Sequence, residues 1–203
     1  KDKLQVIYNP VVDDRIEDQA ALPIQHPWFK PGEPPVFLAV GRLSKQKDYP
    51  TLLQAFAKVC CTHKIRLLIL GEGELRKQLQ DLIKELKVEE SVNMLGFVSN
   101  PYLYMAHATA LVLSSVWEVL PTVLIEALAC GCSVISTDCD YGPREILDEE
   151  RYGKLVPVGD VNALAEAMLN ALTQLPDRQR LKTYAQKFSI KAATDLYIEI
   201  LGL

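Results

Sequence analysis

Residues 111–147 read LVLSSVWEVLPTVLIEALACGCSVISTDCDYGPREIL, and this stretch decides the fold. Up to Thr137 its only charges are Glu118 and Glu126, and Pro121 lies between them. Short apolar runs bounded by Pro and Gly indicate strands and turns, and a longer apolar run indicates a buried helix. The stretch therefore predicts, in order, an apolar strand, a loop, a buried helix, a second strand and a second loop.

The same alternation extends over most of the chain. Short apolar runs predict strands at 36–40, 65–70, 92–97, 110–113, 133–136 and 153–157. Helical spacing of apolar residues predicts helices at 49–61, 74–86, 101–108, 122–130, 143–147, 161–175, 177–188 and 190–201. Strands that alternate with helices favour an α/β fold, here a Rossmann-like, doubly wound parallel sheet of about six strands.

In such folds ligands bind at the carboxyl ends of the strands. This rule selects the loops at 41–48, 71–74, 96–100, 114–121 and 137–142. Among them, Gly71-Glu72-Gly73 is typical of a tight turn, because the third glycine of the dinucleotide-binding fingerprint is missing. Arg144 and Glu145, just beyond the last loop, could contact a ligand, but a glutamate at a helix start beside proline is also ordinary capping.

The first 34 residues are interpreted as a strand and a connector that belong to the same domain as residues 35–203. Residues 3–12, KLQVIYNPVV, predict a short strand that stops at Asn9-Pro10, because proline cannot continue a strand ladder. Residues 13–34 hold four prolines and little periodicity, so we expect a surface connector. A domain that begins in this way suggests a chain cut from something larger at an interdomain linker.

Composition excludes several classes of protein. With 203 residues, 49% of them hydrophobic, the chain can bury the core of one large domain or at most two small ones. A net charge of −4 without a long basic run argues against nucleic acid as a partner. No apolar stretch approaches the roughly 20 residues that span a bilayer, and the start lacks a signal-peptide core. We expect a cytoplasmic protein without a transmembrane segment; peripheral attachment of the intact protein to a membrane stays open.

The five cysteines predict neither disulfides nor a metal site. They are an odd number scattered through apolar segments, which favours buried free thiols in a reducing compartment. Cys60, Cys61 and His63 lie close together, but no second Cys/His cluster at zinc-finger spacing accompanies them. We expect a helix end with two packed thiols there, and structural or surface roles for His26, His63 and His107.

The loop that follows the first core strand carries cations. Residues 41–47 read GRLSKQK, in which Gly41 permits a sharp turn and Arg42 is aimed from the carboxyl end of the strand. Arginine offers phosphate oxygens a planar fork of donors, and Lys47 offers a point charge. Arg42 and Lys47 could converge on a diphosphate. The alternative is a solvated basic loop.

The two glutamates are the stronger indication of a binding site. The helix at 122–130 is apolar on every side except at Glu126, so it is predicted to be buried, and its carboxylate needs a partner. Side chains lean toward the helix N-terminus, which places Glu126 over Thr122 and Val123. Free N–H groups there suit phosphate, and the carboxylate can accept from ribose hydroxyls. The alternatives are a Lys or Arg partner for Glu126 and an exposed loop charge for Glu118.

In their order and spacing, these motifs resemble one family over essentially the whole chain. They are the strand ending at Asn9-Pro10, GRLSKQKDYPTLL from 41, Gly71-Glu72-Gly73, LGFV from 95, the Glu118-x7-Glu126 pair with EALACG, and GPREIL before YGKLVPVGD. The chain is similar to the C-terminal, donor-binding domain of the group 1 (family 4) glycosyltransferases. The resemblance implies one half of a two-domain GT-B enzyme, which transfers a sugar from a nucleotide diphosphate to an acceptor hydroxyl with retention, in glycan or polysaccharide biosynthesis.

The resemblance also implies roles for the matching residues. Arg42 and Lys47 would hold the donor diphosphate and stabilise the leaving group, and Glu118 would contact the donor sugar; these three are the expected catalytic residues. Glu126 would hold the ribose hydroxyls, and the backbone of Val98 would meet the base. The rest of the expected donor site comprises Gly41, Leu120, Pro121 and the phosphate-binding amides of Thr122 and Val123. The family needs no metal and no other cofactor for this.

Two departures from the family pattern affect these expectations. The family often has glycine after the first motif glutamate, where this chain has Val119; if the loop needs positive φ there, a β-branched residue perturbs donor binding. The N-terminal, acceptor-binding domain is also absent, so we expect the fragment to bind nucleotide weakly and to turn nothing over. Its expected partners are the nucleotide-sugar donor and that missing domain.

Two other functions stay open on the sequence. Another GT-B enzyme, such as a sugar-nucleotide epimerase or a phosphorylase, would share the scaffold, although the long chain that carries a phosphorylase's pyridoxal lysine is not visible. A non-catalytic binding module that keeps the fold is the alternative from a different class. Val119 is the feature that favours it.

Overall fold

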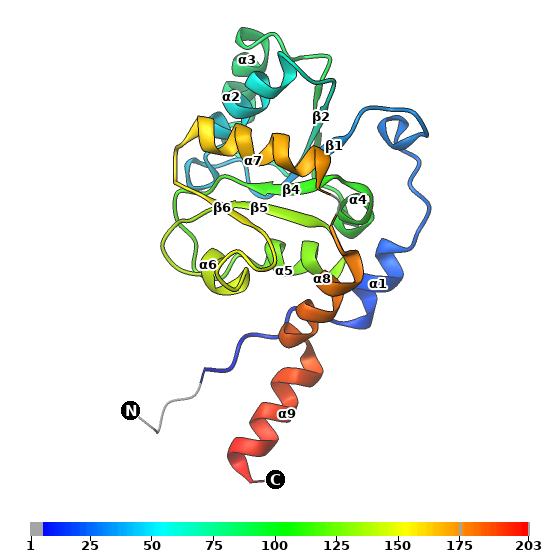
Figure 1. Ribbon diagram of the computed structural model, residues 1–203, viewed down its shortest axis with the longest axis vertical. Coiled ribbons are helices and arrows are strands. Elements are labelled where there is room, and N and C mark those ends of the chain that lie inside the picture. The colour runs from blue at the N-terminus through cyan, green and yellow to red at the C-terminus, as the bar shows by residue number, and fades with distance from the viewer. Residues whose placement is uncertain (1–5, 175, 203) are drawn as a thin grey trace.

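The fold is built around a parallel sheet. The computed structural model describes residues 6–174 and 176–202 and is drawn in Figure 1. Six strands pair in the order β3-β2-β1-β4-β5-β6, and every pairing is parallel. The six strands predicted from residue 36 onward are each present within one residue of their expected ends, and the Rossmann-like, doubly wound sheet is confirmed. The strands are β1 Val36–Val40, β2 Arg66–Leu70, β3 Val92–Gly96, β4 Ala110–Leu113, β5 Ser133–Thr137 and β6 Lys154–Val156.

Helices cover both faces of the sheet (Figure 1). One layer consists of α2 (Tyr49–Cys60), α3 (Arg76–Glu85) and α7 (Val161–Thr173). The other consists of α1 (Asp14–Ala20), α4 (Pro101–His107), α5 (Thr122–Ala129), α6 (Pro143–Ile146) and α8 (Arg178–Ala185). Short 3-10 turns lie at Pro27–Phe29 (η1), Lys45–Lys47 (η2) and Gln186–Phe188 (η3). The last helix, α9 (Ile190–Leu201), projects away from the two layers.

Alternation along the strands produces these two layers. In β1, Phe37 and Ala39 pack in the core beneath α2, α3 and α7, whereas Val36 and Leu38 pack in the core on the opposite face. Because both faces are covered, the inner strands are continuous apolar runs. Fully burying one Leu or Phe side chain stabilises the fold by about 1.5–3 kcal/mol. Two-sided burial therefore fixes the sheet, and with it the loops at its carboxyl edge.

The start of the chain does not form the predicted strand. Positions 3–5 of that prediction lie outside the described residues, and residues 6–11 contain no strand, so the prediction is wrong for the described part. Val12 makes a single parallel bridge with Ser189, and the N–H groups of Val11 and Val12 both donate to the Phe188 carbonyl. Pro10 has no N–H to give to a ladder. The segment is thus held at the end of η3 and does not join the sheet.

The predicted connector at 13–34 is partly helical. Asp13 accepts from the Arg15 N–H and caps α1, whose Ile16 and Ala20 are buried in the core that contains α5. Seven residues make too few turns for a helical period to stand out from the sequence. Apart from α1 and η1, residues 13–34 contain no helix or strand, as expected for a connector.

Three smaller expectations are corrected. The helix expected at 177–188 is α8 followed by η3, and α3 begins at Arg76 because the residues before it form a turn. The helix expected at 161–175 ends at Thr173, and position 175 lies outside the described residues. All five cysteines are free, but Cys61 is exposed and Cys60 is half-buried, so the expected pair of packed thiols at the end of α2 is wrong.

Candidate functional site

Two of the selected loops meet where the order of the sheet reverses. From β1 the chain moves outward to β2 and β3, and it then returns to place β4 on the other side of β1. The loops after β1 (41–48) and after β4 (114–121) therefore leave neighbouring strands at one edge. This switch point is where open α/β sheets bind their ligands.

Glycines let the loop after β1 lie against the loop after β2. A Cβ on Gly71 would be 2.0 Å from the Gly41 carbonyl oxygen, and one on Gly73 would be 2.4 Å from the Leu43 carbonyl oxygen. The Leu43 N–H donates to the Glu72 carbonyl at 2.9 Å. No residue with a Cβ fits at either glycine without moving this backbone. The Gly71-Glu72-Gly73 turn therefore has the structural role expected from the sequence.

Lys47 reaches from the first loop to Glu118 in the second. A Cβ on Gly41 would be 3.3 Å from Lys47 Cε, so glycine at 41 leaves room for the lysine side chain. Lys47 Nζ donates to Glu118 Oε1 at 2.6 Å, and Ser115 Oγ donates to the same oxygen at 2.6 Å. The Lys47 and Glu118 side chains are only 16% and 8% exposed. The alternative of an exposed loop charge at Glu118 is therefore wrong.

Other hydrogen bonds fasten the same two loops together. Ser114 Oγ donates to the Lys47 carbonyl at 2.7 Å. The Val116 N–H donates to the Gln46 carbonyl at 2.8 Å, and Gln46 Nε2 donates to the Trp117 carbonyl at 2.9 Å. The loop with the cations and the loop with Glu118 thus form one connected unit.

The sequence analysis missed four side chains that hold this unit together, those of Gln46, Ser114, Ser115 and Thr137. Gln46 gave no signal, because its partners lie about 70 positions away. Ser115 and Thr137 did carry a signal, since each is a hydroxyl residue where an apolar strand opens into a selected loop. Thr137 Oγ1 donates to the Ser115 carbonyl at 2.6 Å and so ties the end of β5 to the Glu118 loop.

Arg42 is placed at the same edge but differently from Lys47. Its side chain is exposed, and it makes no ion pair within residues 6–174 and 176–202. Lys47 is engaged by Glu118, so convergence of Arg42 and Lys47 on one diphosphate stays a prediction. The guanidinium is free to accept an anion from solvent.

Glu126 is half-buried on α5. Within the described part of the chain it has neither an ion pair nor a side-chain hydrogen bond, so the alternative of a Lys or Arg partner finds no support. Burial raises the pKa of its carboxyl. Its charge in turn contributes to the raised pKa of Tyr102 on α4, after burial, which places the carboxylate near α4. Its expected position over the first turn of α5 stays a prediction.

The first turn of α5 offers unused N–H groups. Pro121 occupies the N-cap position, and no side chain there accepts from the helix amides. Thr122 is exposed and Val123 is half-buried, whereas Leu120 packs against the core. Uncapped first-turn amides together with the helix dipole favour an anion. The arrangement suits the phosphate role expected for Thr122 and Val123 without testing it.

Val119 lies in the loop without backbone strain. It does not adopt positive φ, and its side chain is 84% exposed. Backbone strain from a β-branched residue at positive φ is therefore absent, and an effect of Val119 on donor binding stays a prediction. A Cβ on Gly142 would be 2.8 Å from the Val119 carbonyl oxygen and 2.5 Å from Pro121 Cδ. Gly142, with φ +87, thus lets the loop after β5 pack against the Glu118 loop.

The remaining sequence candidates divide into neighbours and structural residues. Val98 follows β3 and is half-buried against the core. Arg144 pairs with Asp138 and with Glu149, and Glu145 accepts from the Tyr8 hydroxyl at 2.5 Å. These contacts give Arg144 and Glu145 partners within the protein and favour a structural role over ligand binding.

The three histidines also have partners within the chain. His26 Nδ1 accepts from the Trp28 N–H, and the Nδ1 atoms of His63 and His107 lie 2.8 Å from the Thr62 hydroxyl and the Leu103 carbonyl. Structural or surface roles fit these contacts.

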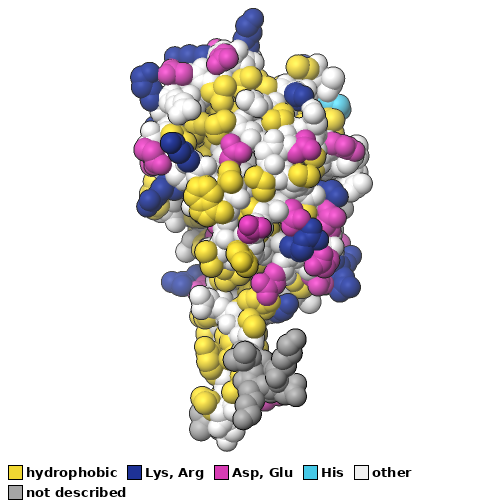
Figure 2. Space-filling view, turned by 90° about the vertical axis from the view of Figure 1, so that its left-hand side faces the viewer, with side chains coloured by type: hydrophobic (Ala, Val, Ile, Leu, Met, Phe, Trp, Pro, Cys, Tyr) yellow, Lys and Arg dark blue, Asp and Glu magenta, His cyan; other side chains and the backbone are white. Residues whose placement is uncertain are grey.

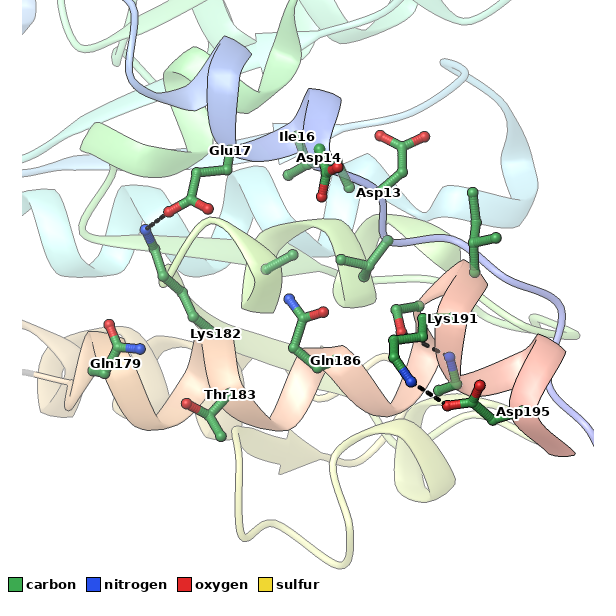
Figure 3. A pocket seen from close by; sticks show the side chains of 15 residues that line it. Asp13, Asp14, Ile16, Glu17, Gln179, Lys182, Thr183, Gln186, Lys191 and Asp195 are labelled. Carbon is green, nitrogen blue, oxygen red and sulfur yellow. Dashed lines mark hydrogen bonds and ion pairs between the residues drawn. The ribbon is translucent and has the colours of Figure 1, made fainter.

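A cavity of about 820 Å³ lies elsewhere, between α1, α8 and the start of α9 (Figure 3). None of the expected donor-site residues lines it. Its wall carries the ion pairs Glu17–Lys182 and Lys191–Asp195, and apolar Ile16 and Ile190 contribute to the rest. Because the cavity lies away from the carboxyl edge and its paired charges converge on no common point, we place the candidate site at the carboxyl edge.

The described residues contain neither a candidate metal-binding cluster nor a membrane-spanning helix. No group of three or more His, Cys, Asp or Glu side chains in residues 6–174 and 176–202 is placed to hold a metal ion. Across the same residues, no helix has both the length and the apolar character needed to cross a membrane.

The chain is similar to known proteins in sequence and in structure. The chain is 37% identical over 190 residues to a Campylobacter jejuni N-acetylgalactosamine-N,N'-diacetylbacillosaminyl-diphospho-undecaprenol 4-alpha-N-acetylgalactosaminyltransferase, covering 94% of this chain and 49% of that protein. The chain thus spans about half the length of this relative. The lipopolysaccharide outer core galactosyltransferase WaaB, in its apo form, matches 99% of the chain and 56% of its own length, with a TM-score of 0.82 and 26% identity.

A third similarity concerns the fold alone. Anabaena HepE in complex with UDP matches 83% of the chain and 49% of its own length, with a TM-score of 0.76 and 23% identity.

The family profile described as "Glycosyl transferases group 1" matches residues 23–188. The candidate site and all six strands of the sheet lie within that range. The chain belongs to the glycosyl transferases group 1 family.

Proposed function

We propose that this chain is the nucleotide-sugar-binding part of a retaining glycosyltransferase of glycan or polysaccharide synthesis. One observation carries the proposal: Lys47 and Glu118, from segments 71 residues apart, meet at the switch point of the sheet. The uncapped first-turn amides of α5 follow the Glu118 loop, and Glu126 on the same helix is half-buried and has no ion pair within the described residues. A cation, a carboxylate and an open helix N-terminus are groups that a sugar diphosphate needs.

The charges assign a role to each group. Arg42, Lys47 and the amides of Thr122 and Val123 bind the diphosphate and stabilise the negative charge that grows on it when the sugar leaves. When Lys47 donates to a phosphate oxygen instead of to Glu118, the Glu118 carboxylate becomes available to accept from the sugar hydroxyls. Glu126, which lacks a partner in the described protein, accepts from the ribose hydroxyls, and the Val98 backbone meets the base.

Fixed positive charge would replace a metal in this mechanism. The side chains of Arg42 and Lys47 and the helix dipole of α5 would supply that charge. We therefore propose metal-independent binding. Nucleotide affinity measured with and without EDTA is expected to be the same, and a large loss on chelation would contradict this part of the proposal.

A second domain would complete the site. The chain matches only about half of the relatives' length. The loops after the strands, which face the viewer in Figure 2, expose a set of large apolar side chains: Phe97, Val116, Trp117, Val119, Tyr141 and Val158. Apolar surface of this kind marks a face that another surface covers. We propose that an acceptor-binding N-terminal domain covers it, that α9 folds back toward that domain, and that the fragment alone binds nucleotide weakly without turnover.

Calorimetry with UDP, GDP and ADP tests the proposal. UDP is the first probe, because HepE was solved in complex with it. We expect one of the three to bind, and Arg42→Ala and Glu126→Ala each to weaken binding about tenfold or more, since each removes a charged hydrogen-bond group. Lys84→Ala, which removes an exposed cation on α3, is the control and should bind as the parent does. If no nucleotide binds, the donor-site assignment is wrong.

The non-catalytic alternative depends on Val119 standing where the family often has glycine. Val119 does not adopt positive φ, so the loop carries no backbone strain there. The calorimetry above separates the two functions, because a non-catalytic module without a donor site would bind none of the three nucleotides.

A further inference from the structure

We propose that Gln46 is a positioning residue of the donor site: it fixes the loop on which Glu118 stands, so that the carboxylate meets the sugar. The inference rests on the proposed function, because it takes Glu118 as the group that contacts the donor sugar. Gln46 itself need not touch the ligand.

Gln46 holds two consecutive residues of the Glu118 loop by different parts of its structure. Its carbonyl accepts from the Val116 N–H at 2.8 Å, and its side-chain amide donates to the Trp117 carbonyl at 2.9 Å. Glu118 is the next residue. A shift in the Trp117 peptide would therefore move Glu118 directly.

The Glu118 loop has little else to hold its middle. Val116, Trp117 and Val119 are 39%, 53% and 84% exposed, so their side chains do not anchor it in the core. Within the described residues, the Val116 bond to Gln46 is the one backbone–backbone hydrogen bond that an amide of residues 114–120 makes outside regular elements. The Gln46 side chain accordingly supplies an anchor that packing does not.

The other anchors act at different points. Thr137 holds the Ser115 carbonyl, before the stretch that Gln46 holds. Ser115 and Lys47 hold the carboxylate end of Glu118. A phosphate that draws Lys47 away removes one of these, whereas the Gln46 amide bond to Trp117 can stay. Gln46 would keep the loop in place at the moment when Glu118 changes partner.

A first experiment reads the loop without any ligand. Amide hydrogen exchange of Val116 is compared in the parent chain, Gln46→Ala and Gln46→Glu. Both variants lose a donor to the Trp117 carbonyl, and we expect faster exchange at Val116 in both. Gln54→Ala, an exposed glutamine on α2, is the matched control and should exchange as the parent does. Unchanged exchange in both Gln46 variants would overturn the proposal.

A second experiment separates positioning from general stability. The quantity is the ratio of the dissociation constants of UDP and of UDP-glucose, UDP-galactose or UDP-N-acetylgalactosamine, whichever binds tightest. We expect Gln46→Ala to lower this ratio about three- to tenfold, the value of one hydrogen bond, with little change for UDP alone. In a Glu118→Gln background the same substitution should have no further effect, because Gln46 acts through Glu118.

The outcomes separate a failure of the proposed donor site from a failure of the positioning role of Gln46. If the parent binds no nucleotide, or Glu118→Gln leaves the ratio unchanged, the proposed function fails at Glu118 and the inference fails with it. If Glu118→Gln lowers the ratio but Gln46→Ala does not, or if the two effects simply add, the donor site stands and the positioning role of Gln46 is overturned.

Discussion

At the scale of residues, the four charged side chains of the candidate site differ in their partners within the protein. Lys47 and Glu118 are both largely buried, and each satisfies the other. The exposed Arg42 and the half-buried Glu126 have no such partner in the described chain. Lys47 and Glu118 are therefore held by each other, whereas the side chains of Arg42 and Glu126 are not held by an ion pair in the described chain.

Removing one member of the buried pair should destabilise the protein. Glu118→Ala leaves the Lys47 ammonium without its carboxylate, and breaking such a pair typically costs about 3–5 kcal/mol. We expect the free energy of unfolding in urea to fall by roughly 2–4 kcal/mol, because the lysine keeps some contact with water. Asp81→Ala, which breaks the exposed Lys77–Asp81 pair, is the control and should leave the urea midpoint unchanged. A neutral result for Glu118→Ala would mean that the pair does not form in solution.

Removing the charge of Glu126 should stabilise the protein and weaken nucleotide binding. Because burial raises the pKa of its carboxyl, the fold favours the protonated form, and ionisation costs stability at neutral pH. We expect Glu126→Gln to unfold at a temperature roughly 2–4 °C higher at pH 7, as a gain of about 1 kcal/mol would give, while nucleotide binding weakens.

The pH dependence provides the check on this prediction. As the pH falls through the raised pKa toward the ordinary glutamate value, the parent carboxyl takes up its proton and the cost disappears. The difference in unfolding free energy between Glu126→Gln and the parent should therefore shrink from pH 7 to pH 4.5. A difference that stays constant would assign the effect to something other than ionisation.

At the scale of elements, the sequence predicted what periodicity and burial determine. The apolar runs predicted all six strands of the sheet. A helical stretch that is apolar except at Glu126 predicted α5. The contact between Lys47 and Glu118 could not be predicted, because it depends on β1 and β4 becoming neighbours. The burial of Glu118 was missed for the same reason. At the start of the chain, the N–H groups of Val11 and Val12 donate to the Phe188 carbonyl of η3. This tertiary contact decides the structure of the segment, although its composition is typical of a strand.

Because the loops after β1 and β2 lie against each other, one added methyl group at Gly71 should lower the stability of the protein markedly. Gly71→Ala puts a Cβ 2.0 Å from the Gly41 carbonyl oxygen, and Gly159→Ala meets nothing within 4 Å although Gly159 also has positive φ. We expect Gly159→Ala to cost about 1–2 kcal/mol from backbone strain alone. Gly71→Ala should cost at least about 1–3 kcal/mol more through overpacking, and should also weaken nucleotide binding. Equal urea midpoints for the two variants would show that the loops separate easily.

At the scale of the whole molecule, exposed apolar side chains gather in two regions. One is the carboxyl edge that faces the viewer in Figure 2, and the other is α9, where Ile190, Tyr197, Ile198, Ile200 and Leu201 are exposed. On α9 only Ala193 is buried. The two regions are surfaces that the packed core does not use.

Shortening α9 should therefore cost little. A chain ending at Asp195 loses no buried residue of the described part, and we expect its free energy of unfolding to change by less than about 1 kcal/mol. Its tendency to self-associate, measured by sedimentation at high concentration, should fall as apolar surface is removed. Phe188→Ala is the contrasting change: that ring is 1% exposed, and its loss should cost about 3–5 kcal/mol. A large loss of stability on shortening would show that α9 packs against the chain in solution.

The separation between Lys47 and Glu118 also has a consequence for how the protein matures. The cation loop leaves the ribosome about 70 residues before the glutamate that answers it, and β1 can pair with β2 long before β4 exists. Closing a long loop delays such contacts relative to local ones. A half-made chain with β1, β2 and β3 in place holds Lys47 but no carboxylate for it. Under the proposed function, nucleotide affinity should therefore appear only after β4 has docked beside β1, so that nucleotide binding during refolding would report the pairing of β1 with β4 and not the earlier pairing of β1 with β2.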